Sequence, residues 1–332
     1  MTAATIQLAH PLTNEAPVQD GQTAPSIVPP LFRFPSLTTT VPKEFVHRAA
    51  VAEVMLTDWK RTDDTHFTVT AQWPRGHSFF SPIGGHHDPL LAAETIRQVG
   101  SLLAHAEFGV PFGHQFLMWD LEYAVEPDQI LIGDTPAALN IDVTCTEVKR
   151  RGGTLAGLRY EAVIHRDGKP TVRGSASYTC TTPAVYRRLR GDRSTPEGTS
   201  QLPLTAPASP QSVGRMSPID VVLSPVGETN RWQLRADTRH HVLFDHPVDH
   251  VPGMVLLEAA RQAAAAALKG STMLPIGIAS EFHRYAELDT PCRIQAQHLP
   301  GTTDGVKSIL VTGHQDGNLV FTSTVKALSP ES

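Results

Sequence analysis

Residues 76 to 100, GHSFFSPIGGHHDPLLAAETIRQVG, align without a gap with residues 240 to 264, HHVLFDHPVDHVPGMVLLEAARQAA, when the chain is shifted by 164 positions (240 − 76). A repeat at a fixed spacing is the signature of a tandem duplication, so we predict two copies of one fold. At the same shift Gly113 falls over Gly277. The identical pairs in the two stretches are His77 with His241, Phe80 with Phe244, His86 with His250, Glu94 with Glu258, Arg97 with Arg261, and Gln98 with Gln262.

Each copy is predicted to contain one long helix and several strands. The helices are expected at residues 89 to 108 and 252 to 269, directly after the His- and Pro-rich loops. Alternating polar and apolar residues predict a strand before each loop, at residues 66 to 73 and 231 to 237. This pattern predicts an α+β fold, with an antiparallel sheet wrapped around a long helix in each copy. Further strands are expected at residues 138 to 148, 157 to 165, 292 to 299, 308 to 314 and 319 to 327.

Two Pro-rich stretches divide the chain. Residues 1 to 42 have little hydrophobic periodicity, and we expect an N-terminal arm. Residues 190 to 212 have the polar, Pro-rich composition of a linker between domains. The two copies are therefore predicted to occupy residues 43 to 189 and 213 to 332.

Composition limits the class of protein. The chain has 332 residues, 40% of them hydrophobic and 18% charged, as in soluble globular proteins. Its net charge of −5 argues against a general nucleic-acid binder. Three cysteines without paired spacing, and the absence of a leader or a membrane-length apolar run, lead us to expect reduced thiols in a cytoplasmic protein with no membrane attachment.

The repeated polar residues lie at helical spacing in both copies. Glu258, Arg261 and Gln262 occupy positions i, i+3 and i+4, which share one side of a helix, and Glu94 begins the same pattern in the first copy. Two interpretations are open at this point. The pairs are either solvated surface ion pairs, worth about 0.2–0.5 kcal/mol each, or a buried working face.

The entry to the second helix resembles that of a known family. Pro252, Gly253, Glu258, Ala259 and Gln262, after a His-Pro loop, resemble the helix entry of the β-hydroxyacyl-carrier-protein dehydratases, which have the hotdog fold. The E-x-x-R-Q repeat together with F-D-H-P-x-D-H-x-P-G-M is more specific, and it resembles the A-factor synthase (AfsA) family of γ-butyrolactone and butenolide hormone biosynthesis. The likeness covers about residues 45 to 125 and 213 to 330.

This resemblance implies a fold, a reaction and two partners. The fold would be a double hotdog that forms a pseudo-dimer within one chain. The reaction would be transfer of a β-ketoacyl group from β-ketoacyl-acyl carrier protein to a hydroxyl of dihydroxyacetone phosphate, giving a phosphorylated ester precursor of the hormone. No cofactor is implied, and a homo-oligomer is possible.

Acyl transfer needs a base, oxyanion donors and, for a phosphorylated acceptor, positive charge. Gly253 could present its N–H at the start of a helix, and Arg261 or Arg97 could hold phosphate with Gln262 and Gln98 beside them. For Glu258 we expect burial to raise the pKa towards that of a useful base. We rank Glu258 above Glu94, because Pro89 stands where the second copy has Gly253 and has no N–H to donate.

The loop histidines complete the candidate catalytic set. His246, Asp245 and His86 are the candidates beside the two glutamates. In hotdog pairs the loop of one half meets the helix of the other, which would group Glu94 with Asp245 and His246, and Glu258 with His77, His86 or His87. The sequence leaves open which group works. Asp245 and Asp249 could equally cap the loop.

Other functions remain open on the sequence alone. The histidines do not have the spacing of a metal site, so we expect no metal. The basic runs at residues 149 to 151 and 187 to 190 are either solvated faces or a dock for an acidic carrier protein. The alternative functions are a hotdog acyl-thioester dehydratase or thioesterase, and a non-catalytic acyl-ligand binder.

Overall fold

The computed structural model describes residues 37–194, 201–269, 273–301 and 305–328. Most of the N-terminal arm expected at residues 1 to 42 therefore lies outside the described residues. The first half contains β1 (Leu56–Arg61), β2 (His66–Trp73), α1 (Leu90–Ala106), β3 (Gln115–Val125), β4 (Ala137–Arg151), β5 (Thr154–Arg166) and β6 (Lys169–Thr181). The second half contains β7 (Leu223–Pro225), β8 (Arg231–Leu234), α3 (Gly253–Ala267), β9 (Leu274–Phe282), β10 (Arg293–His298), β11 (Val306–Gln315) and β12 (Asn318–Leu328). The order of strands and helix is the same in both halves, as the repeat predicts.

A third α-helix lies outside this shared order, whereas a short 3-10 turn precedes the first strand of each half. Helix α2 (Pro183–Arg190) follows the last strand of the first half. The 3-10 turns η2 (Lys43–Val46) and η7 (Pro210–Val213) precede the first strand of their respective halves.

The strands of both halves form one antiparallel sheet of 12 strands, in the order β1-β2-β4-β5-β6-β3-β9-β12-β11-β10-β8-β7. Strands β1 to β6 correspond in turn to β7 to β12. When each strand is replaced by its counterpart, the order is the same from either end of the sheet. The halves meet where β3 pairs with β9, with Asp120 opposite Glu281 and Tyr123 opposite Ile278. The hotdog fold is thus confirmed in both halves, and we interpret their shared sheet as the pseudo-dimer that the repeat suggests.

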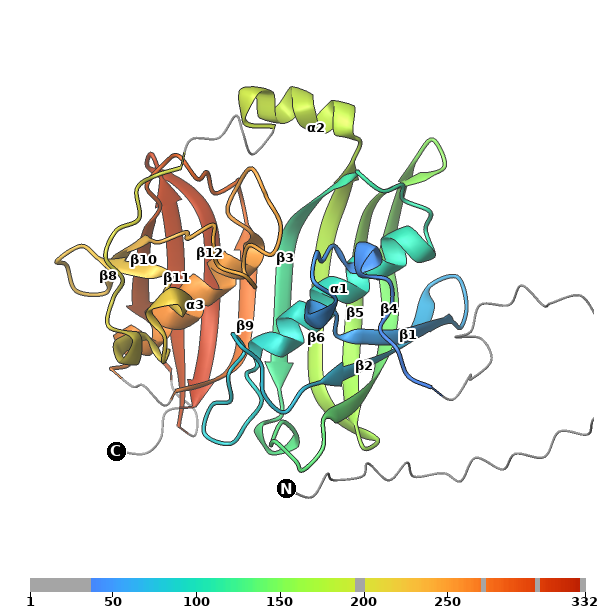
Figure 1. Cartoon of the computed structure of the whole chain (residues 1–332), viewed down its shortest axis with the longest axis horizontal. Coiled ribbons are helices and arrows are strands. Elements are labelled where there is room, and N and C mark those ends of the chain that lie inside the picture. The colour runs from blue at the N-terminus through green and yellow to red at the C-terminus, as the bar shows by residue number, and fades with distance from the viewer. Residues whose placement is uncertain (1–36, 195–200, 270–272, 302–304, 329–332) are drawn as a thin grey trace, which may run out of the picture. The chain divides into compact units, whose positions relative to one another are not determined.

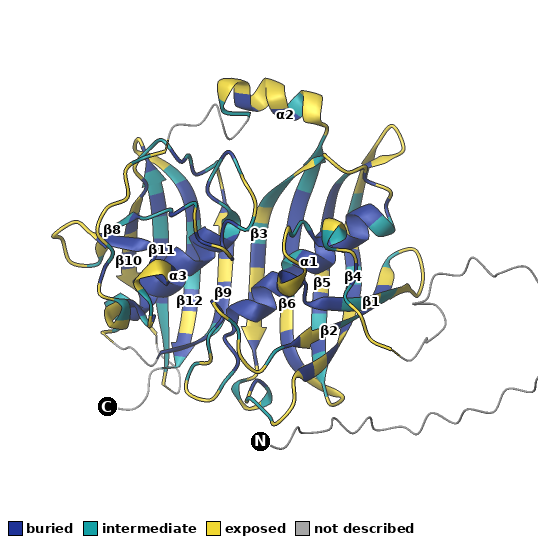
Figure 2. Ribbon diagram, viewed as in Figure 1, coloured by how far each residue is buried: buried dark blue, intermediate teal, exposed yellow. Residues whose placement is uncertain are grey.

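The long helices α1 and α3 lie against the sheet, each over the strands of its own half (Figure 1). Both are almost wholly buried, whereas α2 is largely exposed (Figure 2). Small residues allow this close packing. A Cβ on Gly100 would lie 2.5 Å from the Tyr160 hydroxyl, which donates a 2.6 Å hydrogen bond to the carbonyl of Ile96. The run of alanines in α3, residues 263 to 267, allows the same approach in the second half.

The two predicted helices and the strand at residues 66 to 73 are confirmed within a few residues. Part of the predicted linker is packed rather than free, because the N–H of Leu202 donates to Leu288 and that of Ala208 donates to Leu223. The domain limits at residues 43 to 189 and 213 to 332 remain our interpretation of the repeat. Among the described helices, none has both the length and the apolar character needed to cross a membrane.

Candidate active site

Glu94 of α1 is held by two arginines. Its carboxylate is completely buried and accepts from Arg48 at 2.7 and 3.0 Å, and from Arg97 at 2.7 and 3.0 Å. The Gln98 amide adds a 2.6 Å bond. We call Glu94, Arg48, Arg97 and Gln98 the first clamp.

Glu258 of α3 is held in the same way. Arg215 donates to it at 2.7 and 2.8 Å, Arg261 at 2.6 and 2.9 Å, and the Gln262 amide also donates. We call Glu258, Arg215, Arg261 and Gln262 the second clamp. Because both glutamates are fully buried, the interpretation of the Glu–Arg spacing as a surface ion pair was wrong.

The pKa that we expected for Glu258 was also wrong in direction. Burial alone would raise the pKa, but Arg215 and Arg261 outweigh it and hold the pKa of Glu258 at about 2. Burial opposed by Arg48 and Arg97 likewise leaves the pKa of Glu94 at about 2. Both glutamates are therefore carboxylates at neutral pH with little tendency to accept a proton.

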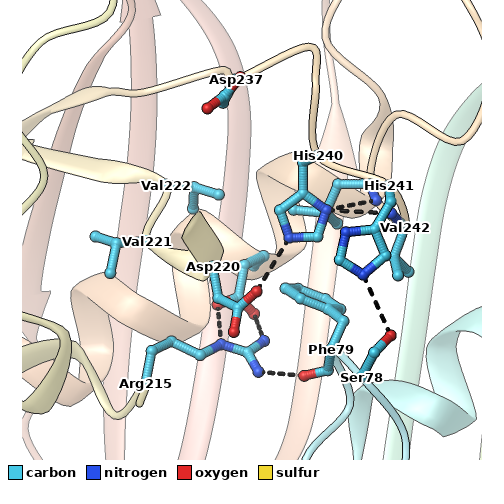
Figure 3. A network of polar contacts seen from close by, with 12 residues as sticks. Ser78, Phe79, Arg215, Asp220, Val221, Val222, Asp237, His240, His241 and Val242 are labelled. Atoms are coloured by element: carbon cyan, nitrogen blue, oxygen red, sulfur yellow. Dashed lines mark hydrogen bonds and ion pairs between the residues drawn. The ribbon is translucent and has the colours of Figure 1, made fainter. Parts of the chain in front are cut away.

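Each clamp reaches into the other half. Arg48 donates to the carbonyl of Val242 at 3.1 Å, and Arg215 donates to that of Phe79 at 2.6 Å (Figure 3). Behind the clamps, the side chains of Gln98 and Gln262 bond the backbone at residues 53 and 55 and at residues 220 and 222, respectively. The clamps therefore fix the two loops, the two helices and the segments before the first strands in one arrangement.

The loop histidines correspond differently from the gapless alignment. His77 accepts through Nδ1 from the N–H groups of residues 79 and 80, and His240 does so from residues 242 and 243. His240 also contacts Asp220 at 3.2 Å, as His77 contacts Glu53 at 3.3 Å (Figure 3). The structural counterpart of His77 is thus His240, a shift of 163 (240 − 77), whereas the alignment paired His77 with His241.

A cleft of about 610 Å³ opens beside the first clamp and is lined by both halves. Arg97, with 19% of its side chain exposed, lies in this cleft together with Asp245, His246 and Gly253 of the second half. The grouping of Glu94 with Asp245 and His246 that hotdog pairs suggest is thus the one found beside this cleft. In the second clamp Arg261 is only 2% exposed, so this clamp is sealed.

Asp245 links the cleft to the first clamp. Its carboxylate is 2.5 Å from Nδ1 of His246, accepts from the N–H of Ala49 at 2.9 Å and lies 3.5 Å from Arg48. Burial opposes these contacts, yet the pKa of Asp245 is lowered. Nearly half of the His246 side chain is exposed, so an aspartate that is held from several sides orients a histidine at the mouth of the cleft.

Asp249 has a structural role four residues further on. It accepts from the Tyr186 hydroxyl at 2.7 Å, pairs with Arg190 at 3.1 Å and lies 2.7 Å from Nδ1 of His250. Arg190 also binds Glu287 and is buried, so the last residue of the basic run at 187 to 190 anchors α2 rather than presenting charge to a partner. Neither aspartate is merely a loop cap.

The helix starts differ as the sequence suggests. The hydrogen-bond ladder of α3 begins with the N–H of Val255, so the N–H groups of Gly253 and Met254, both in the cleft, precede it. In the first half Asp88 caps α1 by accepting from the N–H of Leu90 at 2.9 Å, and its other oxygen is 3.8 Å from Arg215. Burial, opposed by Arg215, raises the pKa of Asp88.

His86 lies apart from both clamps. Its Nδ1 is 3.0 Å from the carbonyl of Gly84 within its own turn. His87 is buried, and burial followed by Arg166 lowers its pKa to about 4. The first half instead meets the Glu258 clamp through Phe79 and Asp88.

Four residues of the site were not predicted from the sequence. Arg48 and Arg215 lie 46 and 43 residues from the glutamates that they bind, and no local pattern connects them. His47 and His105 line or border the cleft beside Arg97, with their Nε2 atoms 2.7 Å apart.

The sheet order, the two clamps and a cleft lined by both halves define a double-hotdog protein. The family model of the A-factor biosynthesis hotdog domain (AfsA) matches residues 33–182 and 197–329. The chain belongs to the AfsA family, which confirms the resemblance found in the sequence.

Three similar proteins are named 2-oxo-3-(phosphooxy)propyl 3-oxoalkanoate synthase. The one from Streptomyces virginiae is 56% identical over 289 residues, 87% of this chain and 98% of the relative. Those from Streptomyces coelicolor and Streptomyces griseus are 44% and 42% identical, over 86% and 85% of this chain and 90% and 93% of the relatives. A crystal structure of a provisionally named oleoyl thioesterase from Lactobacillus plantarum has a TM-score of 0.51 at 11% identity, covering 80% of this chain and 96% of that chain, and shows the fold alone.

Proposed function

We propose that this protein is an acyltransferase that moves a 3-oxoacyl group from acyl carrier protein to a hydroxyl of dihydroxyacetone phosphate. The ester so formed is the 2-oxo-3-(phosphooxy)propyl 3-oxoalkanoate in the names of its relatives. The observation that carries the proposal is the partly exposed Arg97 in a cleft that also contains the Asp245–His246 pair and the start of α3.

The acyl group is assigned to the apolar part of the cleft. A chain that enters beside α3 passes aromatic and aliphatic side chains, which favour an alkyl group over water. Its carbonyl oxygen then meets the N–H groups of Gly253 and Met254, where the helix start stabilises negative charge that develops on oxygen. The apolar lining includes Phe116, Met118, Leu121, Met254, Leu257 and Phe282.

The phosphate is assigned to Arg97 rather than to Arg261. The described hydrogen bonds of Arg97 use Nε and Nη2, so Nη1 is the donor that it can offer to a ligand. Glu94 fixes the plane of this guanidinium, and a fixed planar fork recognises phosphate well. Arg261 makes the same contacts with Glu258 but is buried.

His246 is assigned to proton transfer at the mouth of the cleft. Asp245 accepts from its Nδ1 and thereby orients the ring, and the exposed side of the ring can exchange protons with water. Because the carrier protein stays outside the cleft, its thiol leaves at this mouth. Glu94 and Glu258, whose carboxylate oxygens already accept from two arginines and a glutamine, are assigned to positioning the arginines instead of accepting protons.

The test is to incubate the purified protein with a 3-oxoacyl-carrier protein, with and without dihydroxyacetone phosphate, and to follow products by mass spectrometry. We expect a phosphorylated ester only when the acceptor is present. Free 3-oxo acid or dehydration without the acceptor would overturn the proposal in favour of a thioesterase or dehydratase. Binding of the acyl carrier protein without any product would overturn it in favour of a non-catalytic binder.

A further inference from the structure

The two halves differ along one face of the central helix. In α1, Ser101 and His105 follow Arg97 at helical spacing, and Ser101 lines the cleft. At the 164-residue shift the counterparts are Ala265 in α3 and Lys269, an exposed residue just beyond the end of that helix. The clamp forms in both halves, so it does not require the polar side chains found only in the first.

His47 is the second difference. Arg48 and Arg215 fill the same place in their clamps, a shift of 167 (215 − 48), so the counterpart of His47 is Gly214. Both residues end a 3-10 turn in the left-handed conformation, with φ of 52° for His47 and 70° for Gly214. Glycine adopts this conformation more readily than histidine does. Any benefit from His47 must therefore come from its imidazole.

The contacts of His105 determine where the His47 ring carries its proton. His105 Nδ1 is 2.6 Å from the carbonyl oxygen of Val110, which can only accept, so Nδ1 carries the hydrogen. His105 Nε2 is then an acceptor, and the Nε2 of His47, 2.7 Å away, must donate to it. With both rings neutral, the lone pair of His47 lies on Nδ1.

The surroundings keep His47 neutral. Burial, then Arg97, His105 and His246, lower the pKa of His47 to about 3. Its ring also packs edge-on against Phe116, with centroids 4.7 Å apart. The ring thus carries an unprotonated nitrogen, and His47 lines the same cleft as the arginine that we assign to phosphate.

We propose that His47 is a catalytic residue that accepts the proton of the attacking hydroxyl, and that His105 is the positioning residue that fixes its tautomer. This rests on the proposed function. The hydroxyl oxygen bonds to the thioester carbon as its proton passes to Nδ1 of His47. The C–S bond then breaks, and protonated His246 gives the leaving thiolate its proton. Exchange with water deprotonates His47 and reprotonates His246.

The phosphorylated acceptor itself favours this step. Arg97 is one of the charges that disfavour a proton on His47. A phosphate bound to Arg97 offsets that charge, so His47 becomes more basic once the acceptor is in place. The acyl thioester is thereby protected from water until the acceptor arrives.

The test compares wild-type protein with His47→Gly, which recreates the residue of the second half and relieves the backbone. We expect a folded protein, because the relieved backbone offsets part of the lost contacts with His105 and Phe116, together with a kcat lower by roughly 10²- to 10⁴-fold and a much smaller change in KM for dihydroxyacetone phosphate. Added imidazole should restore part of the rate. His47→Asn, which also tolerates the left-handed conformation, should be inactive and folded.

His105→Asn tests the positioning role. It should lower kcat in the wild-type background and change little in the His47→Gly background, because the two residues act as a unit. An independent arm is nitrogen-15 NMR of the histidines, which should show neutral His47 with its hydrogen on Nε2.

Three results would overturn the proposal. Ester formation by His47→Gly above a tenth of the wild-type rate refutes the His47 role while leaving the acyltransferase intact. A hydrogen on Nδ1 of His47 in the NMR spectrum does the same. Wild-type protein that makes no ester refutes the proposed function and, with it, this role for His47.

Discussion

The two clamps have nearly the same contacts but different surroundings. Each binds a buried glutamate with two arginines and a glutamine, yet Arg97 of the first is 19% exposed in a cleft and Arg261 of the second is 2% exposed. The cleft beside the first clamp contains Gly253, whose N–H lies at the start of α3. Near the second clamp, α1 is instead preceded by Asp88 and Pro89. The duplicated part is the scaffold, and we propose that the unduplicated part marks the site.

Burial explains why the second clamp keeps its charged residues although it is sealed. Once Arg215 and Arg261 are out of water, each needs the charge of Glu258, since an unpaired buried charge is far more costly than the pair. Together these residues also fix the Phe79 loop of the first half through Arg215. The second clamp can therefore be required for the fold without taking part in the reaction.

The largest expected effect is on stability in the sealed clamp. Glu258→Gln keeps the shape but leaves Arg215 and Arg261 without a counter-charge, and removing one partner of a buried pair typically costs about 3–5 kcal/mol. We expect this loss in urea unfolding at pH 7. Glu94→Gln should cost less, because Arg97 reaches solvent and Arg48 retains Asp245. Equal losses in the two variants would remove the distinction between a sealed and an open clamp.

The second expected effect is on stability in acid. The pKa of Glu94 and of Glu258 falls from 4.5 to about 2 in the folded protein. A carboxyl group whose pKa is lowered by folding stabilises the protein above its unfolded pKa and loses that contribution as the pH falls through the folded value. We therefore expect stability to fall between about pH 5 and pH 2, by on the order of 3 kcal/mol for each carboxylate.

Urea unfolding across this pH range provides the measurement, with Glu258→Gln as the control. That variant should lose less stability in acid than the wild type does, because one of the two titrating groups is gone. Parallel pH curves for the two proteins would mean that the Glu258 pKa is not depressed.

The third expected effect separates the clamps by activity. Arg97→Ala should lower kcat/KM for dihydroxyacetone phosphate by roughly 10- to 150-fold, the loss of a charged hydrogen bond worth about 1.5–3 kcal/mol, and should leave binding of the acyl carrier protein nearly unchanged. The matched control is Arg261→Ala, which should lower the melting temperature more and raise the acceptor KM less. If Arg261→Ala raises the acceptor KM more than Arg97→Ala does, the phosphate site has been assigned to the wrong half of the chain.

Much of the scaffold could be predicted from the sequence. The helices and β2 follow from local periodicity, and the Glu, Arg and Gln of both clamps follow from helical spacing combined with the repeat. Strands β3 and β9, which join the halves, were not predicted. In β3 burial does not alternate over its first six residues, so the period of two that indicates a strand is weak there.

Arg48 and Arg215, which complete the two clamps, could not be predicted, because their contacts join residues that are distant in the sequence. Arg48 and Arg215 reverse the direction of the glutamate pKa shifts, and only the folded chain brings them close. The repeat also changes its offset, from 167 at the arginines to 163 at His77 and His240 and 164 at the glutamates, so a gapless alignment hides the equivalence. Glu258 was ranked above Glu94 because Gly253, unlike Pro89, has an N–H to donate, but Gly253 lies in the cleft beside the first clamp, and we now propose the reverse order for activity.

The smallest expected effect tests whether a three-residue spacing of Glu and Arg is enough to make the pair stabilising. Glu228 and Arg231 are also three residues apart and paired, but they are 49% and 52% exposed. Water solvates both charges and salt screens them, so an exposed pair contributes little. Glu228→Gln should change the free energy of unfolding by no more than about 0.5 kcal/mol, with no effect on ester formation, measured beside Glu258→Gln under the same conditions. If Glu228→Gln lost as much stability as Glu258→Gln, burial would not be the reason that the second clamp stabilises the protein.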